Sequence, residues 1–260
     1  MTTDLPAAVD RSRRSIQSIG RAFAVLEAMA AAGGIDSISS LSERLSLPLP
    51  TIHRLLRTLV ELGYARQEPS RMYALGPRLV NLGEASNRLT QAWAGPPLRA
   101  LADEVGETAS FAVLDGVAVV FGAQASGRHS MQMVNEVGRR LGIHCTAAGK
   151  AILAGMPPEQ AARLVATADM RAYTDRTITS VDALMHEVEA SRERGYALEM
   201  GEQEVGVSAV AVALPGDIRR GAVIISGPSA RMGDDTVRRF VPLLLNTAKE
   251  LAVELALAAP

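Results

Sequence analysis

The 260-residue sequence has a single cysteine, Cys145, and no long uninterrupted apolar segment. One cysteine excludes an intrachain disulfide, which is consistent with a reducing compartment. No apolar run approaches the roughly 20 residues that a transmembrane helix needs, and the first residues lack the apolar core of a secretory signal. With 48% hydrophobic residues and a mean hydropathy of +0.12, the chain is expected to be a folded, cytoplasmic protein that does not enter the membrane.

The residue patterns of common catalytic and metal sites are also missing. The four histidines are scattered without the spacing of metal ligands, and Gly149-Lys150 lacks the frame of a phosphate-binding loop. His144 and Cys145 are adjacent, but neighbouring residues of a strand point to opposite faces and are poorly placed to exchange a proton. We therefore expect no enzymatic activity, no metal and no cofactor. Cys145 is interpreted as a small buried side chain, with a redox-sensing thiol as the alternative.

The net charge of −1 is distributed unevenly along the chain. Residues 1–100 contain 12 Arg and Lys residues against 8 Asp and Glu residues, whereas residues 101–260 contain 15 against 20. The N-terminal part is therefore the basic part, as expected where a protein contacts nucleic acid. A bias of this size does not by itself identify a nucleic-acid-binding protein.

The most informative stretch runs from Leu47 to Gly63, where apolar residues recur at helical spacing. Prolines near its start suit a first helical turn, and the glycine at its end suits a helix terminus. The face opposite the apolar stripe carries residues suited to DNA bases and phosphates, namely Thr51, His53, Arg54 and Arg57.

A short helix is predicted just upstream, opened by a capping box at Ser40–Glu43, and two strands are predicted downstream, at 64–66 and 72–75. Two helices joined by a tight turn, the second with outward arginines, are typical of a helix-turn-helix whose second helix enters the major groove. The hairpin makes it a winged helix-turn-helix, with Arg66 and Arg71 placed to contact flanking phosphates. A single amphipathic helix could also belong to an α/β enzyme, but the order of all the elements favours DNA binding.

The chain is predicted to have four parts. Residues 1–15 are expected to be a disordered tail, with a DNA-contacting arm as the alternative. Residues 16–76 form the DNA-binding domain, beginning with its first helix, and residues 77–95 form a linker helix. The Gly-Pro-Pro sequence at its end marks the boundary of an effector domain at 96–260.

The second domain is predicted to be α+β, with strands in antiparallel hairpins and helices beside them, a size and class suited to holding a small ligand. Strands are expected at 108–114, 117–123, 131–134, 196–199, 207–214 and 222–225. Helices are expected at 98–105, 146–154, 158–166, 180–194 and 234–257.

These segments, in this order, resemble the IclR family of bacterial transcriptional regulators. The resemblance spans about residues 16–257 and is carried by SIQSIGRAFAVLEAM, LPLPTIHRLLRTLVELGYARQ, YALGPRLVNLG, HCTAAGKAILA, RGYALEMGEQEVGVSAVAVAL and AVIISGP. It implies an N-terminal winged helix-turn-helix, a linker helix and a C-terminal GAF-like α/β effector domain with an antiparallel sheet. It also implies a homodimer, or a tetramer built from dimers, on a palindromic operator in double-stranded DNA. Family members act as repressors, activators or both.

The resemblance further implies an effector site for a small carboxylate. The site combines an apolar patch, the backbone N–H groups at the start of a helix, an acidic position and two positions on the last strands. Carried onto this sequence, its residues are Met133, Leu141, Thr146, Ala147, Ala148, Gly149, Glu199, Val207, Ala209, Ile224 and Ser226.

Three of these positions differ from the family's commoner residues: Glu199 replaces aspartate, Ala209 replaces cysteine and Ile224 replaces serine. The loss of two polar groups predicts an aromatic or branched-chain acid rather than glyoxylate or pyruvate, with a ligand hydroxyl or amine facing Glu199. The alternative is that Glu199 points to solvent. The sequence thus predicts a transcriptional regulator whose operator affinity is modulated by a small organic acid. The alternative function is a ligand or redox sensor, acting through Cys145, with a degenerate DNA-binding domain.

Overall fold

A computed structural model describes residues 16–134, 137–216 and 220–258 of the chain. Its contacts separate two compact units, which meet in sequence between Ala85 and Ser86. The predicted tail at 1–15 lies outside the described residues. No helix in the described ranges is both long enough and apolar enough to cross a membrane.

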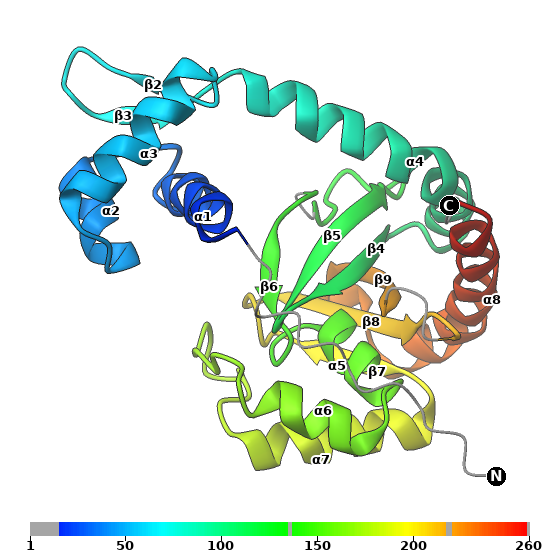
Figure 1. Cartoon of the computed structure of the whole chain (residues 1–260). Helices are drawn as coiled ribbons and strands as arrows, with labels where there is room; N and C mark the ends of the chain where they lie inside the picture. Colours follow the sequence, from blue (N-terminus) through cyan, green and yellow to red (C-terminus); the bar gives the residue numbers. More distant parts are fainter. Residues whose placement is uncertain (1–15, 135–136, 217–219, 259–260) are drawn as a thin grey trace, which may run out of the picture. The chain divides into compact units, whose positions relative to one another are not determined.

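The first unit is a winged helix-turn-helix, which confirms this part of the predicted fold class (Figure 1). It consists of three helices and a small antiparallel sheet in the order β1-β3-β2, whose first strand lies between α1 and α2 in the chain. Fully buried side chains from all three helices, Met29, Leu41 and Leu56 among them, form one core. The elements are α1 (Gln17–Ala31), β1 (Ile35–Asp36), α2 (Ile38–Leu45), α3 (Leu49–Glu61), β2 (Ala65–Gln67) and β3 (Tyr73–Leu75).

The predicted capping box of α2 is wrong by three residues. Ser37, not Ser40, is the N-cap, and its Oγ accepts a hydrogen bond from the Ser40 N–H at 3.1 Å. Ser40 lies inside the helix and its hydroxyl donates to the buried carboxylate of Asp36 at 3.1 Å. Serine is common at both cap and early helix positions, so the spacing alone could not choose between the two serines.

One continuous helix, α4 (Arg78–Val105), replaces the predicted linker helix and the following helix, and the Gly-Pro-Pro sequence does not interrupt it. Pro96 and Pro97 have no N–H, so the carbonyl groups one turn earlier lose their helical donors. Packing holds the helix together beyond them: Ala94 and Leu98 on either side of the prolines are fully buried against the sheet of the second unit. Tertiary packing therefore overrides the local helix-breaking signal.

The second unit contains a six-stranded antiparallel sheet in the order β6-β5-β4-β9-β8-β7, as the predicted α+β class requires. The strand predicted at 131–134 is wrong, because this segment is a loop whose carbonyl groups bind side chains instead of a neighbouring strand. The Thr108 hydroxyl donates to the Met133 carbonyl at 2.5 Å, and Arg231 donates to the Met131 carbonyl at 2.8 Å. The strands are β4 (Thr108–Asp115), β5 (Ala118–Ala125), β6 (Arg140–Gly142), β7 (Ala197–Met200), β8 (Val207–Ala213) and β9 (Gly221–Pro228).

Helices cover both faces of this sheet, and each face has its own apolar core (Figure 1). One face is covered by α8 (Asp234–Ala258) and by the C-terminal part of α4. On this face the rings of Trp93 and Phe111 pack edge to face, with 5.0 Å between their centroids. The other face is covered by α5 (Ala147–Ala154), with α6 (Pro158–Val165) and α7 (Val181–Arg194) beyond it. The short helix η2 (Ser229–Arg231) follows β9.

Candidate functional site

A row of residues crosses three neighbouring strands on the α5 face of the sheet. Glu199 on β7 is paired with Ala209 on β8, and Ala209 is paired with Ser226 on β9. Residues paired across antiparallel strands present their side chains to the same face. Ser226 is in turn paired with Thr108 on β4, whose hydroxyl holds the carbonyl of Met133. Three predicted site residues that lie far apart in sequence are thus brought side by side.

The start of α5 faces this row. Thr146 is the N-cap, and its Oγ1 accepts a hydrogen bond from the Gly149 N–H at 3.2 Å. Lys150 donates its N–H to the Thr146 carbonyl. The N–H groups of Ala147 and Ala148 belong to the first turn, where the helix offers no acceptor, and they carry the positive end of the helix dipole.

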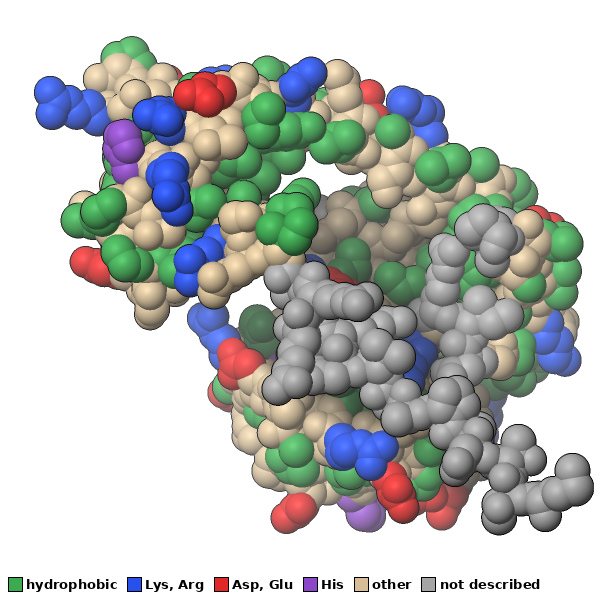
Figure 2. All heavy atoms as spheres, viewed as in Figure 1, with side chains coloured by type: hydrophobic (Ala, Val, Ile, Leu, Met, Phe, Trp, Pro, Cys, Tyr) green, Lys and Arg blue, Asp and Glu red, His purple; other side chains and the backbone are tan. Residues whose placement is uncertain are grey.

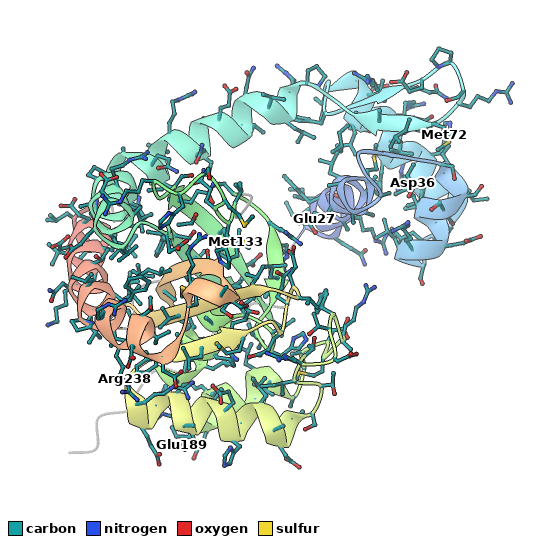
Figure 3. All side chains as sticks on the ribbon, turned by 180° about the vertical axis from the view of Figure 1, so that it is seen from behind. Glu27, Asp36, Met72, Met133, Glu189 and Arg238 are labelled. Carbon is teal, nitrogen blue, oxygen red and sulfur yellow. The ribbon has the colours of Figure 1, made fainter. Side chains whose placement is uncertain are left out.

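The row and the start of α5 line a cavity with about 550 Å³ of atom-free space, part of it open to solvent. We call it the effector cavity. It brings together ten of the eleven predicted effector residues. The loop after β5, which carries Met133, forms another wall (Figure 3). The complete lining is Phe121, Met133, Val134, Arg139, Leu141, Thr146, Ala147, Ala148, Glu199, Gln203, Glu204, Val207, Ala209, Ile224 and Ser226.

Gly149 is the predicted residue that does not line the cavity. Its N–H is used by the Thr146 cap, and its Cα lies against the backbone of Ile143, where an added Cβ would come within 2.3 Å of the Ile143 oxygen. Glycine is needed here for close packing of α5 against the preceding segment. An anion at the start of α5 would therefore have two N–H groups available, those of Ala147 and Ala148.

Sequence reasoning missed five lining residues: Phe121, Val134, Arg139, Gln203 and Glu204. Gln203 and Glu204 follow β7 closely, so their proximity to Glu199 could have suggested them. Arg139 lies two residues before Leu141 and is the positively charged side chain of the lining, but no local motif distinguishes it from other exposed arginines.

A buried ion pair joins α5 to the segment after β7. The Lys150 side chain is 1% exposed, and its Nζ donates to both carboxylate oxygens of Glu202, at 2.6 and 2.8 Å. The Thr174 and Thr177 hydroxyls donate to the carbonyl groups of Gly201 and Glu202 and hold this segment from the other side. The ion pair therefore fixes the distance between two walls of the effector cavity.

Glu199 is 4% exposed and is held in place by backbone groups. Its Oε1 accepts hydrogen bonds from the N–H groups of Glu202 at 2.8 Å and Gln203 at 3.3 Å. The pKa of Glu199 is raised from 4.5 to about 7; burial is the largest cause, and the nearby Glu202 carboxylate also acts to raise it. The two backbone hydrogen bonds and Lys150 oppose this rise. The alternative in which Glu199 points to solvent is inconsistent with its burial.

Cys145 and His144 do not form a catalytic pair. Cys145 is fully buried, its thiol lies 3.5 Å from the Gly142 carbonyl oxygen, and burial raises its pKa to about 12, so the reactive thiolate is disfavoured. His144 Nε2 is 2.9 Å from the carbonyl oxygen of Arg171. Within the described ranges, no group of three or more His, Cys, Asp and Glu side chains is arranged to hold a metal ion.

The DNA-facing residues predicted on α3 lie at the surface of the first unit. His53, Arg54 and Arg57 are exposed and Thr51 is half-buried. Arg57 forms an i,i+4 ion pair with Glu61 at 3.4 Å. Figure 2 shows arginine side chains and a histidine on the visible face of this unit.

The hairpin between β2 and β3 also presents its arginines to solvent. Arg66 is exposed and pairs with Glu68 at 2.6 Å. Arg71 is exposed and has a positive φ of 64°, within the turn that joins the two strands. Both wing arginines are therefore accessible to a partner.

An apolar groove lies between α1, α3 and the first turns of α4. It holds about 1170 Å³ of atom-free space, part of it open to solvent. Ile19 and Phe23 of α1 and Leu82 of α4 are all more than half exposed. Arg54 borders this groove, whereas Arg57 does not.

Two family profiles match the chain. Residues 86–253 match the profile described as bacterial transcriptional regulator IclR C-terminal, and residues 18–69 match the IclR helix-turn-helix domain. The HTH-type transcriptional repressor AllR of Escherichia coli (strain K12) is 30% identical over 253 residues, covering 95% of this chain and 93% of the repressor.

Solved structures share the fold over nearly the whole chain. An IclR-type transcriptional regulator from Silicibacter sp. TM1040 has a TM-score of 0.78 and 29% identity, covering 92% of this chain and 96% of that one. An IclR homologue from Microbacterium hydrocarbonoxydans, crystallised in complex with 4-hydroxybenzoate, has a TM-score of 0.70 and 23% identity, covering 92% and 99%. At that identity the second likeness shows the fold alone.

The Lys150–Glu202 pair generates a stability prediction. Lys150→Met should lower the free energy of unfolding by about 3–5 kcal/mol, because it leaves the Glu202 carboxylate buried without its cation. Urea unfolding followed by the fluorescence of Trp93, the single tryptophan, measures this in the second unit. The double variant Lys150→Met/Glu202→Leu should recover most of the loss.

The matched control is Arg163→Met, which breaks an exposed pair with Glu159 at 3.9 Å and should cost less than about 1 kcal/mol. Equal effects of the two single substitutions would contradict a special role for the buried pair.

Proposed function

Because the chain belongs to the IclR family of bacterial transcriptional regulators, we propose that it binds operator DNA through its winged helix-turn-helix and that a small organic acid in the effector cavity modulates this binding. It is a transcriptional regulator with a helix-turn-helix and a C-terminal ligand-binding domain, not an enzyme. The observation that supports the proposed effector site is the buried row of Glu199, Ala209 and Ser226, which lines the same cavity as the first-turn N–H groups of α5. We propose that it acts in the cytoplasm.

The proposed division of labour follows the predicted domains. Residues 16–76 bind DNA, residues 77–95 link the two functions, and residues 96–260 bind the effector. The redox alternative is not favoured, because Cys145 is buried and its pKa is raised.

The proposed effector is a carboxylate with an apolar body. Its anionic group accepts hydrogen bonds from the N–H groups of Ala147 and Ala148 and is stabilised by the helix dipole. Its body contacts Met133, Leu141 and Ile224, which line the same cavity. The Microbacterium homologue was crystallised with 4-hydroxybenzoate, which is an aromatic acid of the proposed class.

The proposed assembly is a homodimer that places two recognition helices on a palindromic operator, either alone or within a tetramer. The apolar groove of the first unit supports it, because Ile19, Phe23 and Leu82 form a contiguous exposed apolar surface beside α3. A symmetric dimer buries the same surface of both chains and sets the spacing of the two half-sites.

The first prediction from this proposal concerns base recognition. Arg57→Ala should weaken binding to a DNA fragment selected from a random pool by the wild-type protein about 5- to 150-fold, because an arginine contact to a base contributes about 1–3 kcal/mol of discrimination. Fluorescence anisotropy at constant salt measures it. Arg163→Ala is the control, since Arg163 is equally exposed and has the same kind of i,i+4 pair. Equal affinities for Arg57→Ala and the wild type would refute the assignment of α3.

The second prediction concerns the dimer. Phe23→Asp places a charge in the apolar groove and should abolish cooperative occupancy of two half-sites, while a single half-site is still bound weakly. The control Ile35→Asp changes an exposed apolar residue of the same unit outside the groove. Gel shift with one- and two-site DNA, together with sedimentation velocity, reports both variants. A monomeric wild-type protein at micromolar concentration would exclude the proposed dimer.

The third prediction concerns the effector class. Benzoate and 4-hydroxybenzoate should raise the melting temperature of the intact protein more than glyoxylate at equal concentration, because their rings can contact the apolar side chains of Met133, Leu141 and Ile224 in the cavity wall. A ligand at 100 times its dissociation constant adds about 2.7 kcal/mol to stability, which Trp93 fluorescence detects. Ile224→Ser should shift the preference away from benzoate. A larger shift with glyoxylate in the wild type would contradict the proposed class.

A further inference from the structure

We propose that Glu199 recognises the effector as a protonated carboxyl group, donating a hydrogen bond to the effector carboxylate, so that binding takes up one proton. This inference rests on the proposed function, because it assumes that a carboxylate occupies the effector cavity. It makes Glu199 a residue that selects for an anionic acceptor at this position of the ligand.

The hydrogen bonds of Glu199 leave one of its oxygens for the ligand. Oε1 already accepts the N–H groups of Glu202 and Gln203, so its geometry is fixed by the backbone. No described residue forms a hydrogen bond with Oε2, and the side chain lines the cavity while being 4% exposed. The open oxygen therefore belongs to the cavity wall opposite the free N–H groups of Ala147 and Ala148.

The buried positive charge near Glu199 is already paired, and the cation of the cavity lining is exposed. Lys150 of α5 opposes the rise in the pKa of Glu199, but both of its short hydrogen bonds are to Glu202. The thiol of Cys145, which precedes α5, is neutral because its pKa is raised to about 12. At the cavity edge, Arg139 before β6 and Glu204 after β7 are exposed and of opposite sign.

A carboxylate bound at the start of α5 therefore meets a second carboxylate in a buried site. Two adjacent carboxyl groups cannot both remain ionised at low cost, and one of them takes a proton. Burial already raises the pKa of Glu199 to about 7, whereas a small carboxylic acid has an ordinary pKa near 4. The proton therefore resides on Glu199, where Oε2 becomes a donor toward the ligand.

The sign of the pH dependence follows from this assignment. At pH 6 Glu199 is mostly protonated in the free protein, so binding needs little proton uptake. At pH 8 Glu199 is mostly ionised, and binding must take one proton from solution. The dissociation constant should then rise with pH above about 7, approaching tenfold per pH unit. The ligand itself remains ionised throughout this range, so it contributes no such dependence.

The test is isothermal titration calorimetry of the full-length protein with benzoate, which carries a carboxylate and no other polar group. Titrations at pH 6.0 and 8.0, each in two buffers of different ionisation enthalpy, give the number of protons taken up. The wild type should take up close to one proton at pH 8 and much less at pH 6. Glu199→Gln should bind with a pH-independent affinity and no uptake, because its amide presents an oxygen to the backbone and an NH2 group to the cavity.

The matched control is Glu204→Gln, which neutralises the exposed carboxylate of the same cavity and should retain the wild-type uptake. 4-Hydroxybenzoate tests the alternative in which an ionised Glu199 accepts a ligand hydroxyl. That alternative predicts tighter binding of the hydroxylated acid, no proton uptake, and loss of this preference in Glu199→Gln, and observing it would overturn the inference.

Two further outcomes also overturn it: wild-type pH dependence in Glu199→Gln, or loss of benzoate binding in a Glu199→Gln protein that melts normally. If benzoate, 4-hydroxybenzoate and isovalerate all fail to bind the wild type at pH 6, the proposed function fails as well. Binding without proton uptake would contradict the Glu199 inference alone.

Discussion

The buried ion pair between Lys150 and Glu202 is the interaction on which the effector cavity depends. It joins α5 to the segment that follows β7, and these are two opposing walls of the cavity. An ammonium group and a carboxylate lose their hydration at such a site and are stable there only as a well-bonded pair. Because the lysine charge is satisfied by Glu202, it only partly offsets the raised pKa of Glu199 a few residues earlier. The same pair therefore shapes the cavity and leaves it with an unbalanced acidic group.

The cavity and the DNA-binding surface use different physical means of recognition. In the cavity, the proposed contacts come from buried side chains and the N–H groups of Ala147 and Ala148, so the proposed binding depends on shape, desolvation and protonation. On the first unit, Arg57 and the wing arginines are exposed, which suits a highly hydrated polyanion. The apolar groove beside α3 is a third kind of surface, suited to another copy of the chain.

Local patterns were sufficient for most single elements, although they placed the cap of α2 at the wrong serine. The amphipathic spacing after Leu47 predicted α3, and a helix was predicted from residue 146, where α5 has its N-cap. Predictions that depended on distant partners failed. Pro96 and Pro97 remain inside a helix because Ala94 and Leu98 pack on the sheet, and residues 131–134 are not a strand because side chains of Thr108 and Arg231 bind their carbonyl groups.

The sequence by itself determined most of the elements and the helix-turn-helix, since these follow from periodicity and local motifs, and it indicated the family through a resemblance of several segments in order. It also predicted Glu199, Ala209 and Ser226 as effector-site residues, but only through a family resemblance. Tertiary structure alone decided that the three form one row, that Gly149 supports α5 instead of lining the cavity, and that Arg139 and Glu204 complete the lining. The physical reason is that strand register and burial arise from contacts between residues far apart in the chain. The raised pKa of Glu199 has the same origin, because desolvation depends on what surrounds a carboxyl group and not on its neighbours in sequence.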